Sequence, residues 1–164
     1  TGAAVSFGAT GGVMEAALRT VYEVVTGKTL EALDFTDVRG LKGIKESEVD
    51  LDGTKVKVAV VHTLSNARKM LDLIKDGKAD YTFIEVMCCP GGCIGGGGQP
   101  YGATDELRSK RIDAIYRADK DLPLRKSHES PAVKKIYEDF LIEPLGEKSH
   151  HLLHTTYKDR SKKR

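Results

Sequence analysis

Three cysteines lie within six residues of the sequence, as Cys88, Cys89 and Cys93, and a run of glycines surrounds the last of them. Thiolates are soft ligands for iron–sulfur clusters and zinc, whereas thiols this close together do not make a disulfide framework. Six glycines between residues 91 and 98 remove side-chain bulk where something large and rigid must lie against the backbone. The residues alone leave three interpretations open: a cluster, a zinc site, or a turn with buried small side chains.

The elements before this loop predict a βαβ unit. Residues 54–62 alternate valine with lysine and then become apolar, which predicts a strand. Residues 63–77 have the apolar spacing and the closing glycine of a helix, and residues 81–87 predict a second strand, parallel to the first. Because sites in open α/β sheets form beyond the carboxyl ends of strands, the cysteines fall where a site is expected.

Helices are expected to flank this unit. Thr10 predicts the cap of a helix over residues 11–26, with Gly27 at its end. Its expected apolar face consists of Met14, Ala17, Leu18, Val21 and Val25. Residues 28–53 have no sustained period and predict a connection with a short helical turn.

Further helices are predicted towards the carboxyl end. Residues 104–120 predict one helix, and the Ser130–Pro131 pair predicts the start of a short one. A last helical or irregular segment includes residues 149–154, and the basic end, residues 158–164, is expected to be frayed.

Composition narrows the class of protein. The length of 164 residues suits one domain or a large piece of one, and the net charge of +2 gives no argument for nucleic acid or anionic lipid. The sequence has neither an apolar run long enough to span a membrane nor the layout of a signal peptide, so we expect a soluble chain. The apolar, glycine-rich start at Thr1 suggests that something precedes it.

Residues 85–100, EVMCCPGGCIGGGGQP, resemble the last of the three cluster-binding motifs of iron-only hydrogenases nearly residue for residue. Residues 7–19, FGATGGVMEAALR, are similar to the stretch that enters a helix near the same cluster, and residues 125–154 resemble the family's wrap-around tail. The resemblance implies an α/β fold in which a parallel βαβ unit with flanking helices forms one lobe of the catalytic domain. It assigns residues 1–126 to the carboxy-terminal lobe and residues 127–164 to a small-subunit-like helical tail.

The resemblance also implies roles for single residues. Cys89 would ligate a 4Fe-4S cubane cluster, and Cys93 would bridge the cubane to a di-iron subcluster, the two together being the H-cluster. Met87 and Phe7 would line the di-iron site, where hydrogen is formed or split, with apolar side chains. Cys88 departs from the family pattern, which has alanine there; we expect it to point away from Cys89 as a packed small thiol.

The family's two earlier motifs do not occur in this sequence, and with them go two cubane ligands, a proton-passing thiol and a lysine that holds a cyanide ligand. We therefore expect a part of a hydrogenase that is inactive alone and requires a missing amino-terminal lobe as its partner, with the H-cluster expected in the complete protein rather than in the isolated chain. The expected electron carrier is ferredoxin or a nicotinamide-linked subunit, and the fused tail favours a cytoplasmic enzyme. An exposed apolar face could also make the fragment a homodimer.

Two other hypotheses stay open. Relatives of these hydrogenases work in iron–sulfur assembly and keep the cubane ligands without the di-iron unit, although Met87 favours the enzyme. Alternatively, the chain is a dissected domain that folds without metal or binds zinc.

Other candidate residues favour ordinary roles. The histidines near the end, His150, His151 and His154, include an i, i+4 pair but lack a Glu-x-x-His pattern, so we expect surface side chains. We expect His62 to be a satisfied interior or edge residue and Glu15 to be in an ion pair or in solvent. The GATGG turn before a helix lacks the lysine and hydroxyl residue of a P-loop, which excludes nucleotide binding as the main role.

Overall fold

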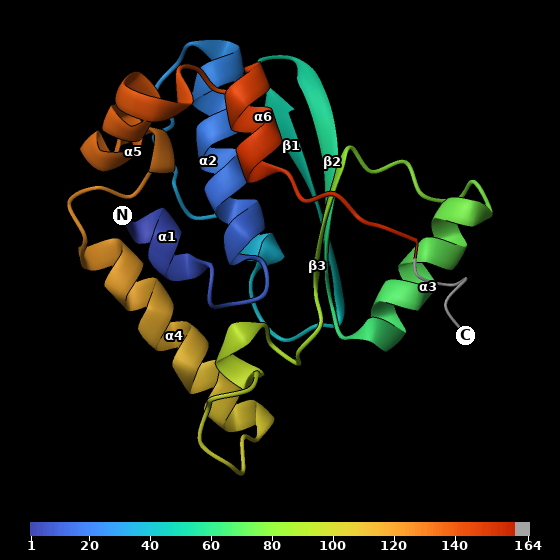
Figure 1. Ribbon diagram of the computed structural model, residues 1–164. Coiled ribbons are helices and arrows are strands. Elements are labelled where there is room, and N and C mark those ends of the chain that lie inside the picture. Colours follow the sequence, from blue (N-terminus) through green and yellow to red (C-terminus); the bar gives the residue numbers. More distant parts are fainter. Residues whose placement is uncertain (160–164) are drawn as a thin grey trace. The chain divides into compact units, whose positions relative to one another are not determined.

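The computed structural model describes residues 1–159, and its contacts divide the chain into two units, Thr1–Ser127 and the residues from His128 onward. The first unit contains a three-stranded sheet in the order β1-β2-β3, with helices packed on it (Figure 1). The predicted α/β class is therefore confirmed.

The sheet is mixed. β2 (Thr54–His62) pairs in parallel with β3 (Phe83–Met87), and α3 (Leu64–Lys75) connects them, so the predicted βαβ unit is confirmed. The register pairs His62 with Met87, which places the carboxyl ends of both strands at the same edge of the sheet.

A strand lies where the sequence predicted only a connection. β1 (Ile44–Leu51) pairs antiparallel with β2 through the two-residue turn Asp52–Gly53. Both turn residues have positive φ, 57° and 93°, as a tight hairpin requires. The Lys45 side chain lies on the buried face of β1. This charge at a core position conceals the alternation of apolar and polar residues that identifies a strand.

The two faces of the sheet bury separate clusters. Alternate β2 residues point to opposite faces, so Val58 and Val60 pack towards α2 (Gly12–Thr26), whereas Ala59 and Val61 pack towards α3. The α2 cluster consists of Met14, Leu18, Val38, Val49, Leu51, Val58 and Val60.

The predicted apolar face of α2 is buried in the first half of the helix and exposed in the second. Its bounds confirm the predicted helix, and Met14 and Leu18 are buried as expected. Val21 and Val25, by contrast, are 41% and 63% exposed, and Val21 lines an open groove between the helix and the sheet.

Two helices pack together beside the sheet. α1 (Gly2–Ser6) contacts α4 (Asp105–Asp121), whose first turn is capped by Thr104 as predicted. Short 3-10 turns lie at Thr36–Val38, Cys93–Gly95 and Ser127–Glu129.

The second unit is helical in its described part. α5 (Pro131–Ile136) continues into a π-helical turn, η4 (Tyr137–Leu141), and α6 (Glu147–Leu153) follows. His150 and His154 stack with ring centroids 4.3 Å apart on the surface, as expected of exposed histidines. The last five residues of the predicted basic end lie outside the described residues. Among the described helices, none is long and apolar enough to cross a membrane.

Candidate metal centre

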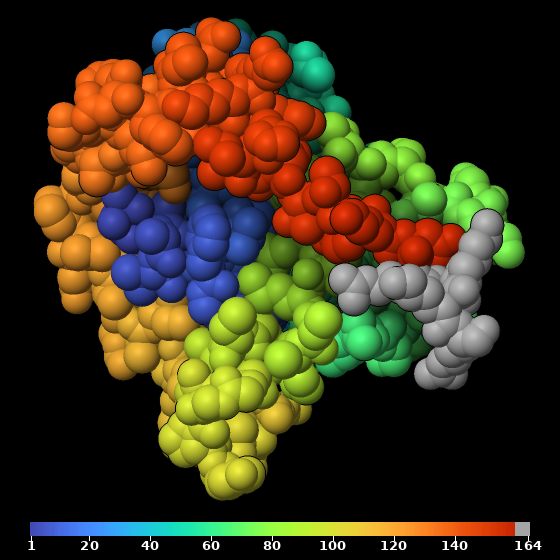
Figure 2. Space-filling view, in the orientation of Figure 1, coloured from blue at the N-terminus to red at the C-terminus, as the bar shows by residue number. Residues whose placement is uncertain are grey.

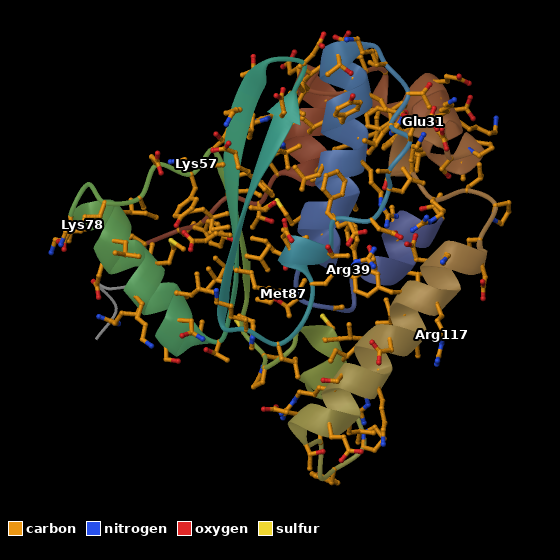
Figure 3. All side chains as sticks on the ribbon, turned by 180° about the vertical axis from the view of Figure 1, so that it is seen from behind. Glu31, Arg39, Lys57, Lys78, Met87 and Arg117 are labelled. Carbon is orange, nitrogen blue, oxygen red and sulfur yellow. The ribbon has the colours of Figure 1, made fainter. Side chains whose placement is uncertain are left out.

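The cysteine loop begins directly after Met87, where β3 ends (Figure 3). Its backbone makes successive tight turns, in which the Gly92 amide donates to the Cys89 carbonyl and the Gly95 amide donates to the Gly92 carbonyl, both at 3.0 Å. All three thiols are free.

The thiols lie at the surface of the first unit. Cys93 and Cys88 are exposed and Cys89 is partly exposed. The expectation that Cys88 is a packed thiol is therefore wrong, since residues of this unit do not cover the end of β3. Because these thiols are exposed, they can bind a metal group whose other ligands come from a different polypeptide segment.

The turn that contains Phe7 lies against the cysteine loop. The Thr10 amide donates to the Gly91 carbonyl at 2.9 Å, and the Ile94 amide donates to the Gly8 carbonyl at 3.0 Å. Figure 2 shows the yellow-green loop beside the blue amino-terminal residues. Segments far apart in the sequence thus meet at one place, with the Phe7 side chain 46% exposed there.

Gly92 lies where the turn, the loop and Met87 meet. Its φ is 91°, and a methyl group built on it would lie 2.7 Å from the Thr10 nitrogen and 2.8 Å from the Met87 sulfur. Only glycine fits this conformation and this space. The close approach also places Met87 beside the turn that follows Phe7.

His62 supports the loop from β2. The Gly91 amide donates to His62 Nδ1 at 3.2 Å, and His62 Nε2 lies 3.0 Å from the Leu41 carbonyl. Because Nδ1 accepts, Nε2 carries the proton and donates, so both ring nitrogens are used. The prediction of a satisfied interior histidine is confirmed, and His62 is not a metal ligand in this arrangement.

A carboxylate that sequence reasoning missed caps α2. Glu85, buried in β3, accepts hydrogen bonds from the Gly11 and Met14 amides, each at 2.7 Å. The predicted cap, Thr10, makes no such bond; Gly11 occupies the cap position and offers no side chain. The helix start is therefore already occupied by a carboxylate, which agrees with the exclusion of a phosphate site.

Lys45 reaches the same turn from β1. Its Nζ donates to the Thr10 carbonyl at 3.1 Å and to the Gly40 carbonyl at 2.9 Å. Burial lowers the pKa of Lys45 to about 8, although the nearby Glu85 charge acts in the opposite direction. Burial also raises the pKa of Glu85, against the amide hydrogen bonds that lower it. The signal for both residues was a charge at an inward-facing strand position.

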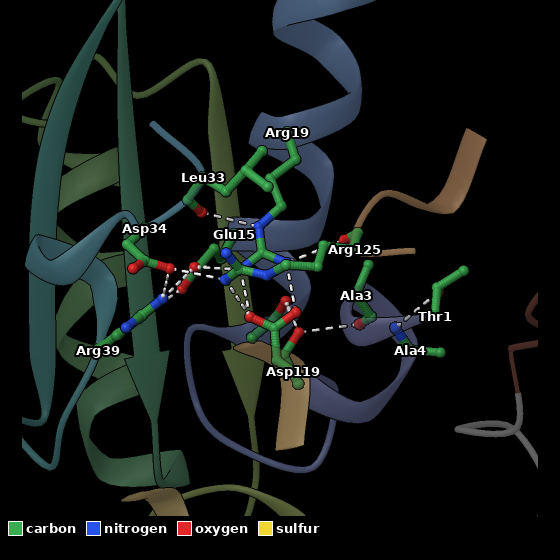
Figure 4. A network of polar contacts seen from close by, with 12 residues as sticks. Thr1, Ala3, Ala4, Glu15, Arg19, Leu33, Asp34, Arg39, Asp119 and Arg125 are labelled. Carbon is green, nitrogen blue, oxygen red and sulfur yellow. Dashed lines mark hydrogen bonds and ion pairs between the residues drawn. The ribbon is translucent and has the colours of Figure 1, made fainter. Parts of the chain in front are cut away.

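A second group of buried charges joins α2 to α4 (Figure 4). Arg19 contacts both oxygens of Asp119 at 2.8 Å and also Glu15 at 2.6 Å, and all three side chains are fully buried. Burial would raise the pKa of Asp119, but hydrogen bonds from Arg19 and Arg125 lower it to about 2. Glu15 forms ion pairs with Arg19 and Arg39, which confirms the first of the two roles expected for it, an ion pair rather than solvent exposure. Arginine guanidinium groups pair with both carboxylates, so this group of charged side chains has a structural role.

The cysteine loop fits one side of an iron–sulfur cluster. A methyl group on Gly96 would lie 3.2 Å from the Cys89 sulfur, so glycine leaves the space beside this thiol open. A cubane cluster has four thiolate ligands as a rule, and the whole sequence contains three cysteines. The donors present therefore suit part of the ligand shell.

Family comparisons agree with this geometry. The family model described as iron only hydrogenase large subunit, C-terminal domain, matches residues 1–97, and the iron hydrogenase small subunit model matches residues 105–160. The chain belongs to the iron-only hydrogenase family. Both matches together include the cysteine loop, the Phe7 turn and most of the carboxy-terminal helices.

Individual iron-only hydrogenases cover nearly all of this chain. This chain is 54% identical, over 96% of its length, to the NADP-reducing hydrogenase subunit HndD of Solidesulfovibrio fructosivorans. It is 42% identical, also over 96% of its length, to iron hydrogenase 1 of Clostridium pasteurianum. A solved structure of the FeFe-hydrogenase HydA1 from Chlamydomonas reinhardtii superposes with a TM-score of 0.72 at 41% identity over 92% of the chain. A probable cytosolic Fe-S cluster assembly factor of Drosophila willistoni is 34% identical over 82%.

The chain spans only part of each of these proteins. It covers 27% and 28% of the Solidesulfovibrio and Clostridium proteins, 28% of the Drosophila protein and 45% of the solved Chlamydomonas chain.

Proposed function

We propose that this chain is the carboxy-terminal part of the catalytic domain of an iron-only hydrogenase and provides one side of its H-cluster site. The observation that carries the proposal is the cysteine loop at the end of β3, hydrogen-bonded to the Phe7 turn, within the stretch that the large-subunit model matches. In the complete enzyme the cubane and di-iron clusters supply the interconversion of protons, electrons and hydrogen.

The proposed roles of the residues come from the resemblance of their motif to the hydrogenase family. Cys89 would hold the cubane, and Cys93 would be the thiolate shared between the cubane and the di-iron unit. Met87 and Phe7 line the di-iron side with apolar groups that exclude water. The contacts at Gly92, which set Met87 against the turn after Phe7, support this shared role.

The remaining ligands come from an amino-terminal lobe, which is the proposed partner. Three cysteines fall short of a cubane shell, so the chain alone is incomplete and inactive. Among the described strands, β3 pairs only with β2, and Phe83 and Val86 on it are exposed, which suits further packing. In this arrangement residues 1–126 form the carboxy-terminal lobe and residues 127–164 the small-subunit-like tail.

A nicotinamide-linked subunit is the proposed electron carrier, and ferredoxin is the alternative. The name of the NADP-reducing Solidesulfovibrio relative favours the first. A cytoplasmic location is proposed because large-subunit and small-subunit models match one chain, without a separate small subunit.

The second candidate function is a cluster-holding protein without hydrogenase activity. The Drosophila relative, named as an assembly factor, supports this alternative. Met87 favours the hydrogenase, because a protein that holds only a cubane has less need of this apolar methionine.

Anaerobic reconstitution tests the proposal. The chain is matured with and without the amino-terminal lobe of a hydrogenase, and iron, zinc, visible absorption and infrared carbonyl and cyanide bands are measured. We expect those bands only when the two parts are combined. Cubane iron without the bands would support the cluster-holding function, and zinc or no metal in both samples would support a dissected apo domain.

Single cysteine variants give matched controls. Cys89→Ser and Cys93→Ser should each remove the infrared bands, whereas Cys88→Ser, next in sequence and equally small, should retain them. Equal loss in all three variants would contradict the assignment of ligands.

A further inference from the structure

The start of α2 is held by a side chain from another element. Helix amino termini leave backbone amides without partners, and a residue at the cap position normally satisfies one of them. Here Gly11 has no side chain to do so, and both oxygens of Glu85 accept from the Gly11 and Met14 amides. The position of the helix start is thereby tied to β3.

Lys45 fixes the other side of the same turn. Its ammonium donates to the Thr10 carbonyl, one residue before the amide that Glu85 binds, and also to Gly40. Glu85 and Lys45 are each less than a tenth exposed. Burying a charge is costly unless it is hydrogen-bonded, and each of these two side chains binds two backbone groups, so they hold a defined geometry rather than an adaptable one.

The turn held in this way is the one that contacts the cysteine loop. Thr10 accepts from Lys45 through its carbonyl and donates to Gly91 through its amide, while the Gly8 carbonyl accepts from Ile94. Glu85 also lies on the strand that ends at Met87. Strand, turn and cysteine loop therefore form one continuous set of hydrogen bonds.

We propose that Glu85, together with Lys45, is a positioning residue that sets the Phe7 turn and the cysteine loop at a fixed separation around the metal centre. This inference rests on the proposed function. Neither side chain touches the reacting atoms; each acts through the backbone of residues 8–11 and 91–94.

The test uses the holoenzyme with Glu85→Gln, which keeps the shape but replaces one acceptor oxygen with a donor. We expect amide exchange across residues 8–14 to accelerate about tenfold, the loss of roughly one hydrogen bond's worth of protection. The carbonyl and cyanide infrared bands should shift or broaden while cubane iron is retained. Lys45→Met should move the same bands in a second, independent variant.

Asp119→Asn is the matched control. It makes the same chemical change at a fully buried carboxylate that binds Arg19 and Arg125. Among the described residues, the hydrogen bonds of Asp119 do not include residues 8–11. We expect it to lower the melting temperature at least as much as Glu85→Gln and to leave the bands in place.

Two outcomes would overturn the positioning role: unchanged bands and exchange in Glu85→Gln, or an equal band shift in Asp119→Asn. Absence of the bands in the unsubstituted holoenzyme would instead overturn the proposed function. In that case amide exchange, which does not depend on the cluster, still decides whether Glu85 holds the turn.

Discussion

Buried charges are the most informative single residues of this chain. Arg19 uses all five of its N–H donors, to Asp119 twice, Glu15, the Leu33 carbonyl and the Arg125 carbonyl. Such complete pairing is what offsets the cost of removing charge from water. It also means that the loss of one partner leaves the other charge buried and unpaired.

Asp119→Asn should make the chain less stable in a pH-dependent way. The pKa of Asp119 is lowered from 3.8 to about 2, so its contribution to stability is present above pH 3.8 and is lost as pH falls towards 2. We expect a loss of about 2 kcal/mol at neutral pH that shrinks across this window. Denaturant unfolding at several pH values measures it. Asp80→Asn, at an exposed pair with Lys57, should change little, and an effect as large there would contradict the argument.

Lys45 should have the opposite kind of pH dependence. Burial lowers its pKa from 10.5 to about 8, so between these values the unfolded chain binds a proton that the folded chain does not. Stability from this residue therefore rises with pH across that window, by about 3 kcal/mol in total. Lys45→Met should lack this rise when unfolding is compared at pH 7 and pH 10.5.

The exposed Lys57 is the control for that measurement. Its hydrogen bond to Asp80 raises its pKa, so its small contribution is lost as pH rises. Lys57→Met should thus change the pH dependence in the other direction. The same sign in both variants would show that burial of Lys45 is not the cause.

Elements that depend on local sequence patterns were predicted correctly, whereas contacts between residues far apart in the sequence were not. The strands at 54–62 and 81–87 and the helix after Thr104 follow from apolar period and caps within a few residues. β1 was missed because Lys45 interrupts its pattern, although the Asp52–Gly53 pair was an available hairpin signal.

The candidate site also divides into a part that a local motif predicts and a part that depends on distant contacts. The sequence motif predicted the loop of Cys89 and Cys93 and its place after a strand. It did not predict the cap of α2, because Glu85 is 74 residues from Gly11, and only the folded chain brings the two together. Cys88 was misjudged for a related reason: whether a thiol is covered depends on which elements surround the strand end.

The hairpin between β1 and β2 makes an element-scale prediction. Gly53 has φ of 93°, and a methyl group on it would have open space, so strain alone opposes a side chain. Gly53→Ala should reduce the free energy of unfolding by about 1 kcal/mol. Gly97→Ala, also in open space but without positive φ, is the control and should be nearly neutral. Equal costs in the two variants would contradict a strained turn.

At the scale of the whole molecule, the first unit exposes apolar surface as well as unpaired thiols. A groove of about 240 Å³ lies between α2 and the sheet, lined almost wholly by apolar side chains that include Leu18, Val21, Val58 and Phe83. Phe83 is 46% exposed on β3, whose outer edge pairs with no other described strand. An apolar groove beside an open strand edge favours association with another polypeptide.

We therefore expect the chain alone to self-associate, and Phe83→Asn to weaken that association. The sedimentation coefficient of the unsubstituted chain should rise with protein concentration, and that of the variant should stay near the monomer value. Leu64→Asn, which removes an exposed leucine at the start of α3, should behave like the unsubstituted chain. Because the proposed amino-terminal lobe would compete for the same surface, adding it should also suppress self-association. A monomer at all concentrations, or equal effects of both variants, would assign the groove and the edge of β3 no part in association.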